Sequence, residues 1–398
     1  MKPIKNIKLA TINCGIKYKN RDDLLLIEFP EDTAVAGVFT KSSMAAAPVK
    51  LCQENLSAKR ARALIVNAGN ANAFTGVGGI VAAKNVAKNV AQILNCEEEK
   101  VFMSSTGVIG ERLKDELIVA ALPKLKEILS EDKTAWDKAA KAIMTTDTFM
   151  KSACKTLQID DKEVVINGFA KGSGMIAPNM ATMLGYIFTN ADICATLMQN
   201  ILSELNEETF NSITVDSDTS TNDTVLLFAT RNAGNKKIRE NHPQLHNFKT
   251  ALKDLMLDLA KQIVVDGEGA TKLIEIEVKG ATSKTAAKII ALNIANSPLV
   301  KTAIAGCDPN WGRIIMAIGK SEQEAEQSKI GIQIGEFKIV ENGELIKNYD
   351  EKPVHQYLLG QQVKIIVDIN LGAKENLSTV WTCDFTEGYI KINKDYRS

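Results

Sequence analysis

The segment from Lys171 to Leu184, KGSGMIAPNMATML, contains the residue types that a self-cleaving loop requires. Two glycines and Pro178 permit a sharply bent main chain, and the small Ala181 leaves its carbonyl open to attack by the hydroxyl of Thr182. That attack would convert the peptide bond into an ester, and hydrolysis of the ester would give Thr182 a free α-amino group. Because such an amine has a reference pKa of about 7.7 to 8.0, it is a base next to the hydroxyl. The segment therefore predicts a threonine nucleophile with its own base.

The same loop also has a purely structural interpretation, because most loops that contain glycine, proline and threonine simply connect two elements. A phosphate-binding loop is not favoured, since neither G-x-x-x-x-G-K-[ST] nor G-x-G-x-x-G occurs in the segment. The three histidines give no other catalytic centre. His242 and His246 have the spacing H-x-x-x-H without the glutamate of a zinc protease, and no pattern points to a Ser-His-Asp enzyme.

The composition is that of a folded globular protein of 398 residues, long enough for two domains or two packed halves. Lysine plus arginine and aspartate plus glutamate both total 48, so no basic excess favours nucleic acid as a partner. We find no apolar stretch of membrane-spanning length and no signal-peptide core at the start. Seven scattered cysteines without a C-x-x-C pair argue against disulfides and a zinc site. We therefore expect a cytoplasmic protein.

Apolar residues at helical spacing alternate with short β-branched runs along the chain, which indicates mixed α and β structure. We expect Pro123 to bend or split one of the helices. The expected helices are 81–94, 113–129, 136–144, 193–205, 245–263 and 282–294, and the expected strands are 62–66, 163–166, 185–189, 224–228 and 273–278. From Ile330 onward the runs IGIQIG, VKIIVDI and STVWTCDF predict an antiparallel sheet.

KGSGMIAPNMATML closely resembles the processing and nucleophile motif of the ornithine acetyltransferase family, the bifunctional glutamate N-acetyltransferases. The resemblance extends along nearly the whole chain, in several motifs in the same order. The further family-like segments are AGVFTKSSMAAAPV (36–49), VNAGNANAFTG (66–76), SSTGVIG (104–110), MTTDT (144–148), VDSDTSTND (215–223), DGEGATK (266–272), GCDPNWGRI (306–314) and the terminal INKDYRS.

The resemblance implies self-cleavage between Ala181 and Thr182, which gives an α chain of residues 1–181 and a β chain of residues 182–398. N-acetylornithine would then donate its acetyl group to Thr182, ornithine would leave, and glutamate would take the acetyl group to give N-acetylglutamate. This ping-pong exchange needs no dissociable cofactor. Some family members also accept acetyl-CoA as a donor, and the sequence leaves both options open.

The resemblance also assigns an oxyanion hole, because both half-reactions and the cleavage pass through a tetrahedral oxyanion. SSTGVIG matches the family segment that supplies the donors, so this role falls to Thr106 and Gly107. Without the resemblance the two residues could equally form an ordinary Ser/Thr/Gly turn. Lys171 matches a lysine that contacts substrate, and its ammonium group suits an α-carboxylate. The alternative for Lys171 is a solvated surface lysine.

Five more residues match family positions that contact substrate. Glu268 lies between two glycines and could pair with the δ-ammonium group of the donor. Thr145 and Thr146 both match a substrate-binding threonine, and the motif does not distinguish them. Asn393 and the terminal Ser398 align with residues that close over the substrate, although terminal residues are commonly frayed.

The Asp- and Asn-rich runs VDSDTSTND and GCDPNWGRI do not have the spacing of a calcium loop, so we expect no metal site. The resemblance implies a structural or pocket-shaping role for both runs. For the fold, the resemblance implies an α/β (α+β) protein of two lobes, with mixed sheets packed between helices. This is the architecture of self-processing aminopeptidases of the DmpA type. It also implies that α and β chains stay together and pair into an α2β2 heterotetramer.

Two other functions remain open from the sequence. A self-processing amidase or aminopeptidase would keep the threonine but use water as the acceptor. A binding or regulatory protein on the same fold would never cleave, although the complete loop motif argues against it.

Overall fold

The protein was analysed as a computed structural model that describes residues 1–177 and 183–395. The chain forms two compact units. Unit 1 comprises Met1–Gly172, Asn179–Asn211 and Thr219–Ile263, and unit 2 comprises Ser173–Pro178, Ser212–Asp218 and Val264–Ser398. Within the described part of the chain, no helix has the length and apolar character needed to cross a membrane.

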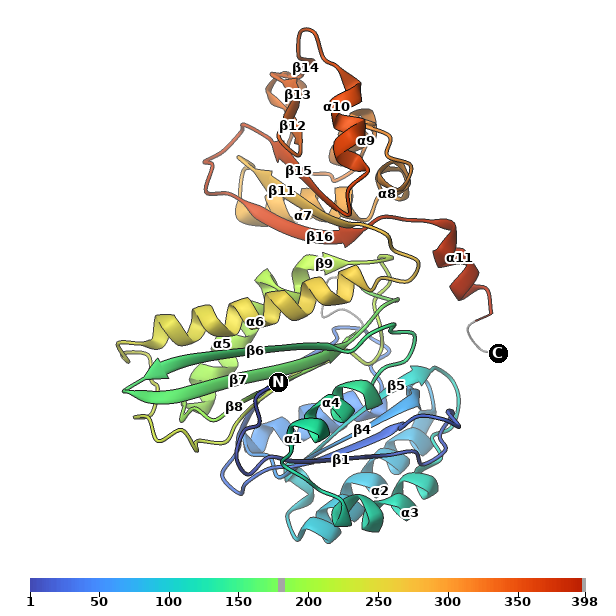
Figure 1. Cartoon of the computed structure of the whole chain (residues 1–398), viewed down its shortest axis with the longest axis vertical. Coiled ribbons are helices and arrows are strands. Elements are labelled where there is room, and N and C mark those ends of the chain that lie inside the picture. Colours follow the sequence, from blue (N-terminus) through green and yellow to red (C-terminus); the bar gives the residue numbers. More distant parts are fainter. Residues whose placement is uncertain (178–182, 396–398) are drawn as a thin grey trace. The chain divides into compact units, whose positions relative to one another are not determined.

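Unit 1 contains two sheets (Figure 1). The four-stranded sheet has the order β1-β2-β4-β5, with β4 and β5 parallel, and its strands are β1 (Lys8–Ile12), β2 (Leu24–Glu28), β4 (Ala63–Asn70) and β5 (Val101–Val108). The five-stranded sheet has the order β3-β10-β8-β7-β6, with β8 and β10 parallel, and its strands are β3 (Ala34–Phe39), β6 (Lys151–Ile159), β7 (Lys162–Lys171), β8 (Leu184–Thr189) and β10 (Thr224–Ala229).

The two sheets of unit 1 face one another across an aromatic core. Phe29 follows β2, and its ring stacks on Phe228 of β10 with 4.3 Å between centroids. Phe102 of β5 meets the same ring edge-on. All three side chains are fully buried, so aromatic packing and burial of apolar area hold the sheets together.

Helices cover the outer faces of both sheets. Alternate residues of β2, β4 and β5 point away from the aromatic core into a second cluster of buried apolar side chains. The helices α1 (Ala47–Asn55), α2 (Gly76–Leu94) and α3 (Asp115–Glu127) contribute further side chains to this cluster. On the five-stranded sheet, Gly168 lies directly under Leu255 and Leu259 of α6 (Leu245–Val265). The remaining helices of unit 1 are α4 (Lys133–Ala142) and α5 (Ala195–Glu208).

Pro123 does not split the helix, because α3 runs from Asp115 to Glu127 with Pro123 inside it. Pro123 is exposed. Water can therefore reach the carbonyl of Val119 that loses its hydrogen-bond donor. The adjacent Leu122 and Leu125 remain buried and keep the helix packed.

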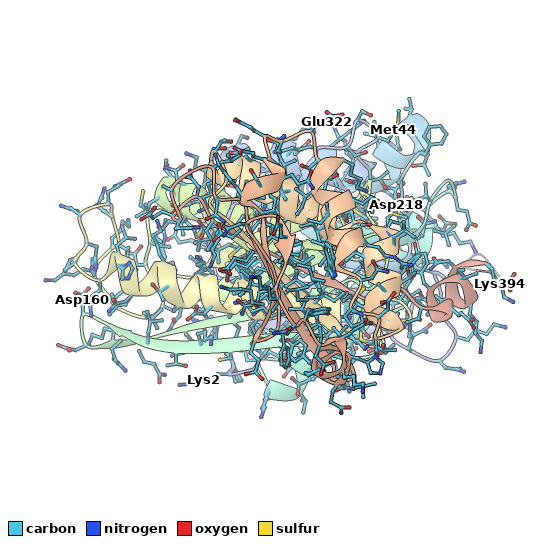
Figure 2. All side chains as sticks on the ribbon, turned by 90° about the horizontal axis from the view of Figure 1, so that it is seen from above. Lys2, Met44, Asp160, Asp218, Glu322 and Lys394 are labelled. Carbon is cyan, nitrogen blue, oxygen red and sulfur yellow. The ribbon has the colours of Figure 1, made fainter. Side chains whose placement is uncertain are left out.

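Strands β6 and β7 form a long hairpin whose turn consists of Asp160 and Asp161, with φ angles of 51° and 58°. Two consecutive positive φ angles are typical of a type I′ turn, which matches the twist of the flanking strands. Figure 2 shows Asp160 at the far tip of this hairpin. The other end of β7 is Lys171, the first residue of the segment that is predicted to cleave.

Unit 2 is built on a seven-stranded sheet of order β14-β13-β12-β15-β11-β16-β9. Its strands are β9 (Ile213–Thr214), β11 (Leu273–Lys279), β12 (Gly331–Ile334), β13 (Phe337–Glu341), β14 (Glu344–Leu345), β15 (Gln362–Asp368) and β16 (Ser378–Cys383). Its further helices are α7 (Lys284–Ala295), α8 (Pro298–Ala305), α9 (Trp311–Gly319), α10 (Glu351–Leu358) and α11 (Glu387–Asn393).

The prediction of an antiparallel C-terminal sheet was wrong in part. β15 pairs antiparallel with β12, but β11 lies between β15 and β16 and runs parallel to β15. The reason is that β11 comes from far earlier in the chain, where helices α7 to α10 supply the long connection that a parallel pair needs. The α/β class with mixed sheets and covering helices is confirmed.

Candidate active site

Thr106 and Gly107 lie at the end of β5, where its pairing with β4 becomes irregular. Gly107 has a φ of 135°, and a Cβ placed there would lie 2.2 Å from the carbonyl carbon of Gly69. Only glycine fits both the conformation and the close approach of the two chains. Thr106 is 9% exposed, so its polar groups lie in a largely dry environment.

Asn222 of the VDSDTSTND motif ties this segment to its neighbour. Its Nδ2 donates to the carbonyl of Ser105 at 2.9 Å and to the carbonyl of Ala71 at 2.6 Å. Asn222 is buried, so these hydrogen bonds are shielded from water. The main chain beside Thr106 is therefore fixed by a side chain from a distant part of unit 1.

Lys171, the last residue of β7, is buried, with 5% of its surface exposed. Its Nζ donates to Thr106 Oγ1 at 3.4 Å. The alternative of a solvated surface lysine is thus wrong, because β7 lies inside the five-stranded sheet and carries the residue into the interior. A buried ammonium next to the predicted oxyanion donor is a suitable place for an anionic group.

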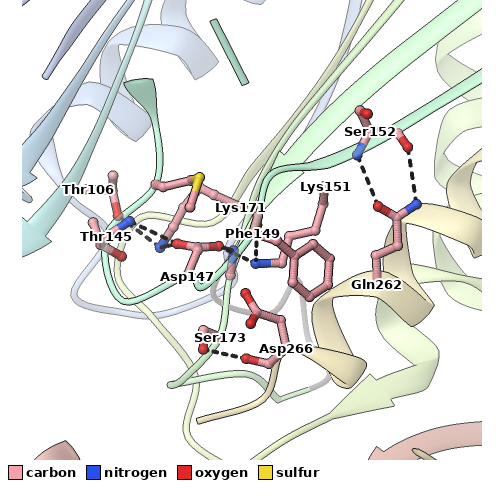
Figure 3. A network of polar contacts seen from close by, with 12 residues as sticks. Thr106, Thr145, Asp147, Phe149, Lys151, Ser152, Lys171, Ser173, Gln262 and Asp266 are labelled. Carbon is pink, nitrogen blue, oxygen red and sulfur yellow. Dashed lines mark hydrogen bonds and ion pairs between the residues drawn. The ribbon is translucent and has the colours of Figure 1, made fainter. Parts of the chain in front are cut away.

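Asp147 of the MTTDT motif joins these groups in one network (Figure 3). Its Oδ1 accepts hydrogen bonds from Lys151 Nζ at 2.6 Å and from Gly172 N at 2.7 Å. Its Oδ2 accepts one from Thr145 N at 2.8 Å and lies 4.0 Å from Lys171 Nζ. One carboxylate therefore positions two predicted substrate-binding residues and the start of the loop.

Burial alone would raise the pKa of Asp147, but the nearby positive charges and hydrogen bonds lower it by more. The ammonium groups of Lys171 and Lys151, with hydrogen bonds from Lys151 and the amide of Thr145, lower this pKa to about 2. Asp147 is therefore a fixed anion at neutral pH. Its negative charge stabilises both ammonium groups in a buried position.

Thr145 and Thr146 both lie in the bend between α4 and β6 and are half-buried. The amide of Thr145 is held by Asp147, while Arg21 donates from Nη2 to the carbonyl of Met144 at 2.8 Å. The structure thus places both threonines on the same restrained bend.

The predicted cleavage point, Ala181 and Thr182, lies outside the described residues. On its carboxyl side, Met183 N donates to Asp223 Oδ1 at 3.0 Å within unit 1. On its amino side, Ser173 belongs to unit 2, where its Oγ donates to the carbonyl of Asp266 at 2.5 Å and its carbonyl accepts from Glu268 N at 3.1 Å. Both flanks are therefore anchored by hydrogen bonds.

Glu268 and Asn393 meet in unit 2, where Asn393 Nδ2 donates to Glu268 Oε2 at 2.7 Å. Glu268 is 8% exposed. A Cβ added at Gly174 would lie 2.4 Å from the same oxygen, so the glycine leaves the space in which the carboxylate sits. Asn393 is the last residue of α11, and Ser398 lies outside the described residues.

Asp216 binds the main chain on the amino side of the predicted cleavage point. Its carboxylate accepts from Met175 N at 2.6 Å and from Ile176 N at 2.9 Å, and it accepts a third hydrogen bond from the hydroxyl of Tyr389 at 3.1 Å. Burial raises the pKa of Asp216, and these hydrogen bonds oppose the rise. The residue links the flank to helix α11, which carries Asn393.

The structure therefore brings Thr106, Thr145 and Lys171 into one network in unit 1 and brings Glu268 and Asn393 together in unit 2. Sequence reasoning missed Asp147, Asp216, Asn222 and Asp223. All four lie inside the motifs MTTDT and VDSDTSTND. The repetition of short polar residues in these segments was the sequence feature that could have indicated them. In the described ranges, no group of three or more His, Cys, Asp or Glu side chains is arranged to hold a metal ion.

Comparison with known proteins adds independent information. A sequence model of the ArgJ family matches residues 8–398. The chain is 50% identical over 396 residues to the arginine biosynthesis bifunctional protein ArgJ of Gluconobacter oxydans, covering 99% of this chain and 92% of that protein. It is 51% identical over 397 residues to the protein of that name from Ruegeria pomeroyi, covering 99% and 95%.

A solved structure of the arginine biosynthesis bifunctional protein ArgJ from Bacillus halodurans is also similar. It has 45% sequence identity and a TM-score of 0.51, and it covers 52% of this chain and 97% of that chain. Family model and relatives agree over almost the full length, so this chain belongs to the ArgJ family.

Proposed function

We propose that this protein transfers an acetyl group from N2-acetylornithine to glutamate through an acetyl ester on Thr182, after self-cleavage between Ala181 and Thr182. In the terms of enzyme classification it is a glutamate N-acetyltransferase of arginine biosynthesis. The observation that carries the proposal is the buried contact of Lys171 with Thr106, within a chain that shares about half of its residues with bifunctional ArgJ proteins.

The proposed roles follow from the chemistry of each group. Thr106 and Gly107 donate to the oxyanion, where one such donor contributes about 3 to 4 kcal/mol to the transition state. Lys171 binds the substrate carboxylate, with Thr145 and Thr146 beside it on the restrained bend. Glu268 binds the δ-ammonium group of the ornithine part, supported by Asn393 and Ser398. The free amine of Thr182 acts as the base.

The reaction as proposed requires no resident cofactor, since Thr182 itself carries the acetyl group from the α-amine of ornithine to the amine of glutamate. Acetyl-CoA is a candidate second donor, because the relatives carry the word bifunctional in their names. Incubation with acetyl-CoA and glutamate alone distinguishes a starter enzyme from one that only recycles acetyl groups.

For the assembly, we propose that the two chains remain bound after cleavage and that two αβ units form an α2β2 heterotetramer. The hydrogen bonds that Ser173 donates to Asp266 and that Ile176 donates to Asp216 support continued association. We also place the protein in the cytoplasm, which is supported by seven free thiols, since oxidising compartments favour disulfides.

The test measures consumption of acetylornithine with and without glutamate. The proposal expects ornithine release beyond one equivalent per enzyme only when glutamate is present, with N-acetylglutamate formed in equal amount. Equal consumption without glutamate, with release of free acetate, would identify an amidase instead. No consumption by a chain that stays whole would identify a binding protein.

A further inference from the structure

A cavity of about 390 Å³ in unit 1 concentrates positive charge. Five cationic side chains line it, and none of the described residues around it is acidic or aromatic. The lining residues are Ala58, Lys59, Arg60, Cys194, Ala195, Thr196, Arg231, Lys237 and Arg239. The volume falls in the range of about 300 to 1,000 Å³ that small-molecule sites occupy. We call it the cationic cavity.

The positive charge of the cationic cavity is only partly balanced by the protein itself. The carboxylate of Asp192 lies 3.7 Å from Arg231 Nε and 4.0 Å from Lys237 Nζ. Within the described part of the chain, Lys59, Arg60 and Arg239 form no ion pair with an acidic side chain. Like charges gathered in one cavity repel one another, and a bound anion would remove that repulsion.

Helix α5 begins at the same cavity, because its first two residues, Ala195 and Thr196, belong to the lining. The first main-chain amides of a helix have no partner within the helix. Cys194 provides no side-chain cap, and no acidic residue occurs in the first turn. Lys59 Nζ donates to Thr196 Oγ1 at 3.1 Å, which holds one cation beside these amides. The start of α5 thus adds hydrogen-bond donors and a partial positive charge to the cavity.

The cationic cavity and the predicted cleavage point lie toward opposite ends of two strands. β8 and β10 pair in parallel, and each has six residues. The strands start next to Met183 and Asp223, which are joined by a hydrogen bond. After the strands end, the chain reaches Cys194 and Arg231 at the cavity. A strand of this length spans roughly 16 Å, so the cavity is separate from the proposed acetyl-transfer site.

We propose that the cationic cavity binds the oligophosphate group of a small molecule, a chain of two or more linked phosphates. Arg60 and Arg239 carry planar guanidinium groups, which pair with phosphate oxygens two at a time. Lys59 and Lys237 add positive charge, and the first amides of α5 can accept a phosphate oxygen as their partner. Several cations on one cavity match several linked phosphates better than a single anion.

The chemistry of the lining also indicates what is not recognised. Without an aromatic side chain in the lining, no nucleobase can stack there, so the site recognises the phosphates that inorganic triphosphate and a nucleoside triphosphate share. Sites for single-stranded nucleic acid combine positive charge with stacking aromatic side chains. Lysine plus arginine and aspartate plus glutamate both total 48 in the chain, so the positive charge is local. A small oligophosphate is therefore favoured over a nucleic acid.

The test is isothermal titration of the full-length chain with sodium triphosphate and with ATP, without divalent metal, in about 0.1 M salt. The double variant Arg60→Gln with Arg239→Gln should raise Kd for both ligands at least about 10-fold. Arg112→Gln with Lys50→Gln is the matched control, because it removes the same two positive charges from exposed positions elsewhere in unit 1. Its Kd should stay within about 3-fold of wild type. Tighter binding of ATP would identify a nucleotide as the source of the phosphates, and equal or tighter binding of triphosphate an inorganic source; both support the inference.

Three results would overturn the inference. One is no binding of triphosphate or ATP at about 1 mM, and another is an equal Kd in the two double variants. The third is tighter binding of citrate or of a single-stranded RNA oligonucleotide than of triphosphate. If circular dichroism shows that the double variant is unfolded, Arg239→Gln alone, at an exposed position, decides with an expected Kd increase of at least about 5-fold. Binding is measured without acetyl transfer, so failure here leaves the proposed function standing.

Discussion

Lys151 Nζ lies 2.6 Å from Asp147 Oδ1 in an ion pair whose two side chains are fully buried. Replacement of Asp147 by asparagine would leave the Lys151 ammonium buried without this counter-charge. We expect Asp147→Asn to lower the free energy of unfolding by about 3 to 5 kcal/mol, measured by urea denaturation at pH 7. The exposed Asp32→Asn should change it by less than about 0.5 kcal/mol. Equal stability of the two variants would contradict the role of the pair.

The same pair predicts the stability of the protein in acid. The folded-state pKa of Asp147 is about 2 and the ordinary pKa of an aspartate is 3.8, so the contribution of Asp147 to stability is fully present above pH 3.8 and is lost as pH falls toward 2. This window corresponds to about 2 kcal/mol of the unfolding free energy. The difference between wild type and Asp147→Asn should therefore shrink between pH 4 and pH 2 in thermal melts. A constant difference across that window would show that Asp147 is not held as an anion.

Lys171 is expected to act in substrate binding. Because a charged hydrogen bond contributes about 1.5 to 3 kcal/mol, Lys171→Met should raise KM for acetylornithine by about 10- to 100-fold. Lys162→Met, at the exposed other end of the same strand, is the matched control and should leave KM unchanged. Steady-state kinetics on processed protein makes the comparison. Equal KM values for both variants would refute the assignment.

Gly174 is expected to set the position of Glu268. The methyl group of Gly174→Ala would lie 2.4 Å from Glu268 Oε2, so the carboxylate must move and lose its hydrogen bond from Asn393. We expect KM for acetylornithine to rise by roughly 10-fold, since displacing a charged partner costs about 1.5 kcal/mol. Gly78→Ala, where nothing lies within 4 Å of the added carbon, is the control. An unchanged KM in Gly174→Ala would argue against ligand binding by Glu268.

Tyr389 is expected to hold helix α11 in place through its hydroxyl on Asp216. Tyr389→Phe should speed hydrogen exchange of the α11 amides by about 5-fold, because a net hydrogen bond contributes about 1 kcal/mol. Tyr357→Phe removes a hydroxyl in helix α10 that accepts from Lys364 N, and should leave α11 unchanged. If both variants give wild-type exchange in α11, the hydroxyl does not restrain the helix.

The sequence was sufficient to predict about half of the helices and strands of the described residues, those whose apolar periodicity is strong. The predicted strand 185–189 corresponds to β8 and the predicted helix 245–263 to α6. The sequence did not predict that β11 pairs with β15, since hydrogen bonds between strands almost 90 residues apart leave no local sequence pattern. Sheet order depends on tertiary packing, which periodicity does not describe.

The candidate site was predicted in part. Thr106, Thr145 and Lys171 were chosen from their motifs and meet in one network, whereas their roles toward substrate stay predictions. The buried acids Asp147 and Asp223 could not be recognised, because an aspartate in a polar segment is ordinarily exposed. Their importance comes from burial and from hydrogen bonds to main-chain amides, and both depend on the folded chain.

The most direct test of the account is the mass of the denatured protein after incubation with acetylornithine, for wild type and Thr182→Ala. The account predicts two wild-type fragments, residues 1–181 and 182–398, with one acetyl group added to the second, and an uncut variant without the acetyl group. An uncut wild-type chain, or an acetyl group on Thr182→Ala, would contradict Thr182 as the nucleophile.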